Sequence, residues 1–239
     1  MTLSGKRVLV LGGTSGIGLA VAEAASAEGS DVVVVSSHQS RVDAALTLLG
    51  DSSEGYVADL SDETSTAALF SQIGPFDHLV FTAGDSVWQR AIGDTELEDA
   101  KGFFALRFWG AFAAAKHGSK LIRPGGSIVL TSSTLPRRPS IGFAVGASIN
   151  SAVEALARAL AVELAPVRVN VVAPGIVRTP LWNRLPEEQR EAFFATRGAA
   201  LPAGKVGDPA DIAEAYLFLM RGAFTTGQTV VVDGGMLLV

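Results

Sequence analysis

The stretch Val8–Gly18, VLVLGGTSGIG, decides the fold of this chain. Its first four residues form a short apolar run, the mark of a strand that is buried on both faces. A glycine-rich turn follows, and the apolar residues of 19–25 then have the spacing of a helix. Because glycines let the backbone approach a pyrophosphate and a helix start offers unpaired N–H groups, this order predicts a nucleotide-binding site. The alternative is a glycine-rich turn without a ligand, and the flanking strand and helix argue against it.

Length and composition limit the function classes. The chain has 239 residues, of which 48% are hydrophobic and 18% charged, as in a globular protein with mostly buried strands. A formal net charge of −5 argues against nucleic-acid binding. Zero cysteines exclude disulfides and thiolate chemistry, and the three histidines have no metal-ligand spacing, so we expect no metal site. With no signal peptide or membrane-spanning run in the pattern, we expect a cytoplasmic protein.

Six further apolar runs predict the remaining strands, at 31–36, 55–58, 77–82, 126–132, 167–172 and 228–232. Helical patterns occur between them, at 41–49, 62–73, 97–121 and 147–164. Strands that alternate with helices predict an α/β protein with a doubly wound, seven-stranded parallel sheet, a single-domain Rossmann fold over 1–239. Ligands of such sheets bind at the carboxyl ends of the strands. The residues expected near a ligand are therefore those of 12–18, 36–41, 59, 81–84, 132–133 and 174–179.

The end of the second strand indicates which dinucleotide is bound. An acidic residue there selects NAD by holding the ribose 2′-hydroxyl, whereas hydroxyl or basic groups admit the 2′-phosphate of NADP. The segment 36–41 is SSHQSR and contains no carboxylate. Ser36, Ser37 and His38 offer hydrogen-bond donors, and Arg41 lies one turn into the next helix, so the sequence favours NADP(H) over NAD(H). A polar strand end that touches no ribose is the alternative.

Several motifs, in order along the chain, resemble those of the short-chain dehydrogenase/reductase family. They are LGGTSGIG (11–18), Asp59-Leu60, TAG (82–84), IVLTSS (128–133), AVEALARALAVELAPVRVNVVAPG (152–175), PGIVRT (174–179) and GQTVVVDGG (227–235). The resemblance implies a cofactor site near the turn of Gly12, Thr14, Ser15, Gly16, Ile17 and Gly18. It further implies Asp59 and Leu60 beside the adenine, Ala83 and Gly84 along the ribose, and the Pro174-Gly175 turn with Val177 and Thr179 toward the nicotinamide.

The catalytic residues of that family are only partly present. Family members use a Ser, a Tyr that donates a proton, a Lys four residues later that lowers the phenol's pKa and holds the nicotinamide ribose, and an assisting Asn. Ser133 matches the Ser, but Gly146 stands at the Tyr position and Asn150 at the Lys position. Arg107 aligns with the Asn. The two tyrosines, Tyr56 and Tyr216, are not followed by a lysine four residues later.

Ser133, Ser148, Asn150 and Arg107 remain as candidates for the catalytic site. Arg107 is a clamp for a carboxylate or an oxyanion, or else a structural or solvated cation. Ser133 either acts on substrate or caps nearby backbone. The aromatic residues of 103–112 fit helix packing better than a substrate site. The aromatic and apolar residues Trp182, Leu185, Phe193 and Phe194 of the expected substrate lid, about 180–206, form either a pocket wall or lid packing.

Three functions fit this pattern. The first is an NADP(H)-dependent oxidoreductase of an unknown small-molecule substrate, with an acceptor such as an iminium ion or a conjugated carbonyl. The second is a non-catalytic NADP(H)-binding sensor or partner-binding protein. The third is a structural subunit of a mixed oligomer. The helices expected at 97–121 and 147–164 resemble the family's subunit interface, so we expect a homodimer or homotetramer, and no nucleic-acid or membrane partner.

Overall fold

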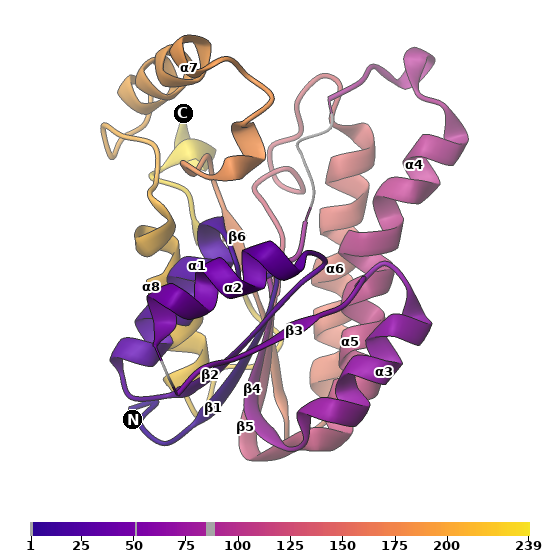
Figure 1. The fold of residues 1–239 in the computed structure, drawn as a ribbon. Helices are drawn as coiled ribbons and strands as arrows, with labels where there is room; N and C mark the ends of the chain where they lie inside the picture. The colour runs from indigo at the N-terminus through magenta and orange to yellow at the C-terminus, as the bar shows by residue number, and fades with distance from the viewer. Residues whose placement is uncertain (1, 51, 85–88) are drawn as a thin grey trace.

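The first strand of the computed structural model has a neighbour on each side. Residues 2–50, 52–84 and 89–239 are described. β1 (Arg7–Leu11) pairs in parallel with β2 (Asp31–Ser36) and with β4 (Phe76–Phe81). Within the described residues the strand order is β3-β2-β1-β4-β5-β6-β7, and every pair is parallel (Figure 1). The α/β Rossmann fold with a seven-stranded parallel sheet, predicted from the sequence, is confirmed.

The remaining strands are β3 (Glu54–Val57), β5 (Ile122–Thr131), β6 (Arg168–Pro174) and β7 (Thr229–Val232). β5 begins four residues before the expected start at 126, because Ile122 already pairs with Phe76 at the start of β4. The register then shifts, and regular pairing resumes where His78 meets Ser127. The glycines and the proline of 124–126 hide this early start from the hydrophobic pattern.

Helices cover both faces of the sheet. The described α-helices are α1 (Gly16–Ala27), α2 (Gln39–Leu49), α3 (Glu63–Ile73), α4 (Leu97–Phe104), α5 (Ala111–Gly118), α6 (Ala144–Glu163), α7 (Glu187–Ala199) and α8 (Pro209–Arg221). Short 3₁₀ turns lie at Ile92–Asp94, Ser119–Leu121, Pro180–Trp182 and Met236–Leu238. α1 packs beside α8 on one face, and α3, α5 and α6 cover the other (Figure 1). α7 lies in the expected lid, beyond the carboxyl ends of the strands.

The expected single helix at 97–121 is wrong in detail. A π-helical segment, Ala105–Gly110, separates α4 from α5. The chain continues through it without a break, so apolar periodicity does not reveal the one widened turn. The π geometry changes the direction of the side chains that follow it, and such turns are frequent at functional sites. Arg107 lies in this segment.

The core is split between the two faces of the sheet. In β1, Val8 and Val10 belong to the apolar cluster under α1 and α8, whereas Leu9 and Leu11 belong to the cluster under α3, α5 and α6. All four side chains are fully buried. This alternation explains why β1 reads as a continuous apolar run, and it holds the carboxyl end of the strand rigidly beneath the glycine-rich turn.

α6 has the length and composition of a helix that can cross a membrane. This is the described helix that meets both criteria, although no apolar run of that length was expected from the sequence. One third of its most apolar window is buried inside the fold, where it packs against β5 and β6. Core helices of soluble proteins meet the same criteria.

Candidate functional site at the carboxyl ends of the strands

The glycine-rich turn after β1 tolerates no side chain at two positions. A Cβ on Gly12, where φ is +88°, would stand 2.6 Å from the backbone nitrogen of Ala83. A Cβ on Gly18 would stand 2.1 Å from the Gly12 carbonyl oxygen. The turn is therefore packed tightly against the end of β4, and α1 begins within it at Gly16. The backbone N–H groups at the start of α1 can bind a phosphate group, as the sequence predicts.

The segment after β4 forms the floor beside this turn. The Thr82 backbone N–H donates to the carbonyl of Leu11 at 2.9 Å. Its hydroxyl lies within hydrogen-bond distance of the Leu11 and Gly12 carbonyl oxygens, at 3.2 and 3.3 Å. These bonds bring Ala83 and Gly84, expected along a cofactor ribose, against the turn that was expected to hold the phosphates.

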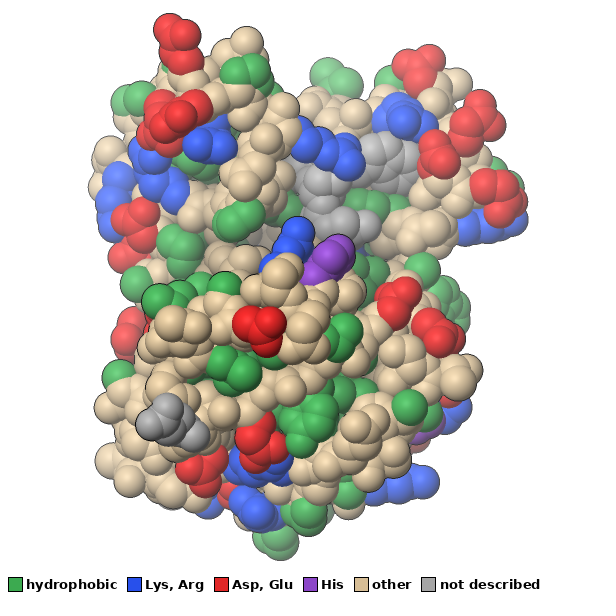
Figure 2. All heavy atoms as spheres, viewed as in Figure 1, with side chains coloured by type: hydrophobic (Ala, Val, Ile, Leu, Met, Phe, Trp, Pro, Cys, Tyr) green, Lys and Arg blue, Asp and Glu red, His purple; other side chains and the backbone are tan. Residues whose placement is uncertain are grey.

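The polar end of β2 lies at the same edge of the sheet. Ser36 is buried, whereas Ser37, His38 and Arg41 are exposed. The Ser37 hydroxyl is 2.8 Å from His38 Nδ1, and α2 begins directly afterwards at Gln39. Figure 2 shows Lys and Arg side chains above the position of α1 and α2. The arrangement suits a phosphate on the adenosine ribose, because it presents hydroxyl, imidazole and guanidinium groups and no carboxylate from this segment.

Asp59 and Leu60 follow β3 and differ in exposure. The exposed Asp59 carboxylate accepts hydrogen bonds from the hydroxyl and the backbone N–H of Ser61, at 2.6 and 2.9 Å, and these bonds lower its pKa. The Leu60 side chain is 5% exposed and packs in the core. Asp59 is therefore available to a ligand through its carboxylate, whereas Leu60 offers a ligand little beyond its backbone.

The segment after β6 reaches back to the glycine-rich turn. Thr179 Cγ2 would lie 3.2 Å from a Cβ on Gly16. Pro174 ends β6, Gly175 packs against Asp233, and Val177 is buried and forms a β-bridge with Gly207. Of the residues expected here, Thr179 is the one shown touching the turn.

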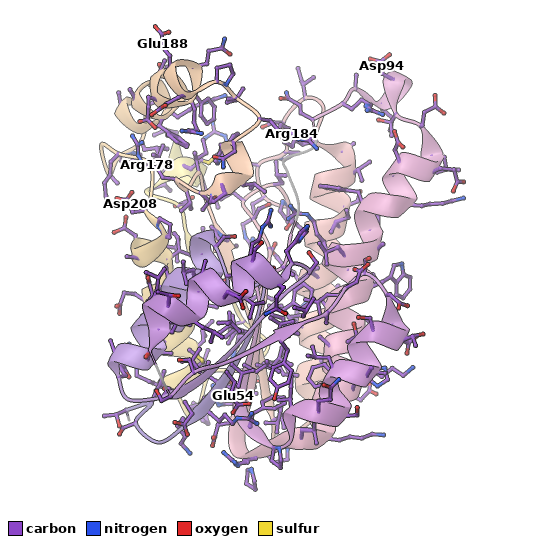
Figure 3. All side chains as sticks on the ribbon, in the orientation of Figure 1. Glu54, Asp94, Arg178, Arg184, Glu188 and Asp208 are labelled. Atoms are coloured by element: carbon purple, nitrogen blue, oxygen red, sulfur yellow. The ribbon has the colours of Figure 1, made fainter. Side chains whose placement is uncertain are left out.

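The aromatic residues of the lid pack on each other. The ring centroids of Trp182 and Phe193 are 4.7 Å apart, and those of Trp182 and Phe194 are 6.3 Å apart. Arg178 stacks over Phe194 and pairs with Glu191. Arg178 and Arg184 both lie in this region (Figure 3). The three rings therefore contact one another, and the sequence prediction of a pocket wall or of lid packing stays open.

The space beside Gly146 is apolar. The described atoms within 4 Å of a Cβ built on Gly146 are Leu135 Cδ1, at 3.3 Å, and Phe143 Cδ1, at 3.9 Å. Ser133 Oγ, from the segment after β5, accepts a hydrogen bond from the Leu135 backbone N–H at 3.2 Å. Ser133 thus shapes the backbone of this loop. Ser148 is exposed on α6 and donates to the Ala144 carbonyl.

Arg107 and Asn150 line one small cavity of about 30 Å³, together with Thr82, Ala83 and Thr131. Arg107 reaches it from the π-helical segment, and Asn150 reaches it from α6. The Asn150 side-chain amide donates to the Gly146 carbonyl at 2.7 Å. These two candidates from the sequence are therefore brought together, at the carboxyl ends of β4 and β5.

Both tyrosines lie elsewhere. The Tyr56 hydroxyl donates to Glu54, which lies at the end of the molecule opposite Arg178 and Arg184 (Figure 3). Tyr216 is fully buried on α8, 2.7 Å from the Thr131 hydroxyl, and burial raises its pKa far above the ordinary value of 10. Neither phenol stands at the position that Gly146 occupies.

The sequence pattern did not predict one buried charged cluster. Glu154 on α6 is 6% exposed and accepts a hydrogen bond from Ser132 at 2.9 Å. Arg137 binds the same carboxylate through two hydrogen bonds, at 2.8 and 3.1 Å. The cluster ties the loop that carries Ser133 to α6. A signal existed, since Glu154 interrupts the apolar stripe of α6 and two arginines stand in the preceding loop.

Comparison with known proteins gives one consistent answer. The pattern of the family described as Enoyl-(Acyl carrier protein) reductase matches residues 12–237. Short-chain dehydrogenase/reductase ATR9 of Stachybotrys chlorohalonatus is 38% identical over 99% of both chains. Short-chain dehydrogenase/reductase ucsE of an Acremonium species is 36% identical over 99% of this chain and 97% of its own.

Solved structures agree with the sequence comparisons. A small-chain dehydrogenase solved in complex with NADPH is 40% identical, with a TM-score of 0.87, and the match covers 99% of this chain and 100% of that one. The MalC reductase/Diels-Alderase of Malbranchea aurantiaca is 31% identical, with a TM-score of 0.92, over 99% of this chain and 98% of that one.

Proposed function

This chain is a member of the short-chain dehydrogenase/reductase family of oxidoreductases, and we propose that it is an NADP(H)-dependent reductase whose acceptor needs no phenolic acid. The observation that carries the proposal is the apolar space beside Gly146, which is bordered by Leu135 and Phe143. In this proposal the dinucleotide site is kept, whereas the Tyr and Lys that transfer a proton in the family are replaced by Gly146 and Asn150.

The dinucleotide site supports NADP(H) as the cofactor. Gly12 and Gly18 form a backbone cradle that a Cβ would fill, next to the N–H groups at the start of α1. Ser37, His38 and Arg41 present donors where the 2′-phosphate would bind. When bound, NADPH supplies a hydride. The relative solved with NADPH has the same fold over nearly its whole length.

The missing phenol restricts the acceptor. An unperturbed phenol has a pKa near 10, and losing a positioned acid typically costs about 10²–10⁴ in rate. An unactivated ketone is therefore a poor substrate, because its oxygen must receive a proton as hydride arrives. An iminium carbon needs no proton at that step, since the electron pair of its C=N bond moves to a nitrogen that is already cationic. In a conjugated carbonyl the hydride adds to the β-carbon, and the electron pair moves to oxygen as an enolate.

Arg107 favours the conjugated carbonyl between these two acceptors. Arg107 lines the cavity beside Asn150, and its guanidinium carries a fixed positive charge. Such a charge stabilises an enolate oxygen that forms nearby and repels a cationic iminium group. We therefore place conjugated carbonyl compounds first among the substrate classes.

The test is NADPH oxidation, followed by absorbance, with an unactivated ketone, a cyclic iminium salt and a conjugated enone. We expect turnover of the enone, slower turnover of the iminium salt and little of the ketone. Titration of NADPH and NADH tests the cofactor, with Arg41→Ala compared with Lys120→Ala, which removes an exposed cation from the short turn Ser119–Leu121. Arg41→Ala should weaken NADPH binding and leave NADH unchanged. Tight NADPH binding without turnover in all three classes would instead support the non-catalytic binding protein.

We also propose that two or four copies of the chain associate through the helices on the α4–α5–α6 side. Trp109 is 56% exposed and Phe112 is 40% exposed, and they extend an edge-to-face series of rings that begins at Phe104. Leu97 and Val162 are also exposed on this side. An apolar surface of this kind, on helices that lie side by side in Figure 1, fits a second copy of the same chain.

A further inference from the structure

We propose that Arg107 and Asn150 together bind the nicotinamide riboside half of the cofactor, with the cation and the amide exchanged relative to the family pattern. The inference rests on the proposed NADP(H) binding and deepens it. In this arrangement the positive charge of the site comes from Arg107 in the π-helical segment, and not from a lysine at position 150 on α6.

The position of the Arg107 guanidinium is well defined. A Cβ built on Gly84 would lie 3.0 Å from each of three of its atoms, Cζ, Nη1 and Nη2. Equal distances to three coplanar atoms mean that the guanidinium lies flat over Gly84. Its carbon is also 5.1 Å from the centre of the Phe103 ring. The group is thus held against the end of β4 by packing on both residues.

Asn150 lines the same cavity as Arg107. It lies one helical turn after Gly146 on α6, and its hydrogen bond to the Gly146 carbonyl fixes the orientation of the side chain. The cavity that the two residues share is small, about 30 Å³, so Arg107 and Asn150 lie close to one another.

The topology decides which half of the cofactor meets this pair. In a doubly wound sheet the dinucleotide crosses the switch point, here between β1 and β4, with one nucleotide on each side. The polar end of β2 faces the adenosine side. Arg107 and Asn150 lie at the ends of β4 and β5, so they face the second nucleotide. A guanidinium offers five N–H donors and an amide offers both donors and an acceptor, which suits ribose hydroxyl groups.

The exchange keeps one cation in the site. The family pattern places the amide at position 107 and the ammonium at position 150, whereas this chain has Arg107 and Asn150. A lysine at 150 beside Arg107 would put two positive charges into one small cavity, which is unfavourable. The two differences from the family pattern therefore belong together, since each makes the other acceptable.

The experiment compares two ligands by calorimetric titration. NADPH contains the nicotinamide riboside, and 2′,5′-ADP lacks it while keeping the 2′-phosphate. We expect Arg107→Asn to weaken NADPH binding about tenfold or more and to leave 2′,5′-ADP binding unchanged. Asn150→Lys should also weaken NADPH binding. The double variant Arg107→Asn/Asn150→Lys should restore most of it, which a purely structural role for Arg107 would not do.

The outcomes separate this inference from the proposed function. If the unaltered chain binds neither ligand, both fail. If it binds both ligands and Arg107→Asn has no effect, or weakens both equally, only the exchange is wrong. A double variant no better than the worse single variant also contradicts it. Arg107→Lys keeps a charge and should bind NADPH better than Arg107→Asn, and the thermal unfolding midpoint of each variant confirms that it is folded.

Discussion

Gly146 on α6 lies against the side chain of Leu135, whose Cδ1 would be 3.3 Å from a Cβ at that position. A methyl group thus borders the space into which a tyrosine at 146 would extend. We expect Gly146→Tyr alone to give no reduction of unactivated ketones, because no cation at 150 lowers the phenol's pKa.

Restoring the family pattern as a set should give a different result. The triple variant Arg107→Asn/Gly146→Tyr/Asn150→Lys should reduce an unactivated ketone about 10²-fold faster than the unaltered chain. The matched control carries Phe in place of Tyr at 146, which keeps the ring and removes the hydroxyl. Initial rates of NADPH oxidation distinguish them, and equal rates in the two triple variants would show that the phenol contributes nothing.

Gly18 should tolerate no side chain. A Cβ there would stand 2.1 Å from the Gly12 carbonyl and 2.5 Å from the Thr82 hydroxyl, so α1 must move away from the turn. We expect Gly18→Ala to lower the free energy of unfolding by about 3 kcal/mol and to abolish NADPH binding, as measured by urea titration and calorimetry. Gly102→Ala is the control: a Cβ there meets nothing within 4 Å, and alanine favours the helix. Equal stability of the two variants would refute the steric argument.

His78 should make stability depend on pH. It is 4% exposed and pairs with Ser127 at 2.9 Å, and its burial lowers its pKa to about 4. The unfolded chain binds a proton below about pH 6.5, whereas the folded protein does not until about pH 4, so stability falls as pH decreases between these values.

When the pH decreases from 7.5 to 5.0, His78 alone should lower the free energy of unfolding by about 2 kcal/mol. His78→Gln keeps a partner for Ser127 and does not titrate, so its urea midpoint should change less over the same range. The neighbouring Asp77 also makes stability depend on pH, but at lower pH values than His78. Its burial raises its pKa, but hydrogen bonds from Arg7, Lys6 and Arg123 outweigh this and hold the pKa below 3.8. If the urea midpoints of the unaltered protein and of His78→Gln change in parallel with pH, His78 is excluded as the cause.

Trp109 tests the proposed association of copies. A charge in an apolar interface must lose its hydration, so Trp109→Lys should shift the protein toward monomer in sedimentation velocity at micromolar concentration. Leu48→Lys on α2 is the matched control, because Leu48 is 63% exposed on a different side of the molecule. A monomeric unaltered protein, or no change in Trp109→Lys, contradicts the proposal.

The fold was largely predictable from the sequence because its signals are local. Continuous apolar runs marked strands buried on both faces, and β1 shows why, since its side chains alternate between two cores. Asp62, expected near a helix start, caps α3 by accepting from the N–H groups of Thr64 and Ser65. The π-helical segment was not predictable, because one wider turn leaves the apolar pattern of 97–121 almost unchanged.

The sequence predicted which segments form the candidate site, but it predicted less well which side chains contact one another there. The sequence placed Arg107 and Asn150 among the candidates, but their shared cavity depends on packing between elements forty residues apart. Glu154 was missed because a carboxylate on an apolar stripe is ordinarily read as an exposed position, and its partners Ser132 and Arg137 come from another segment.

The hydroxyl of Thr82 approaches the carbonyl of Gly12 across seventy residues of chain. During synthesis the glycine-rich turn therefore leaves the ribosome well before the strand that must brace it. Until β4 has been translated and paired, the first nucleotide-binding half lacks the neighbour that holds its turn closed. The closed form of this turn accordingly depends on a strand that is synthesised about seventy residues later.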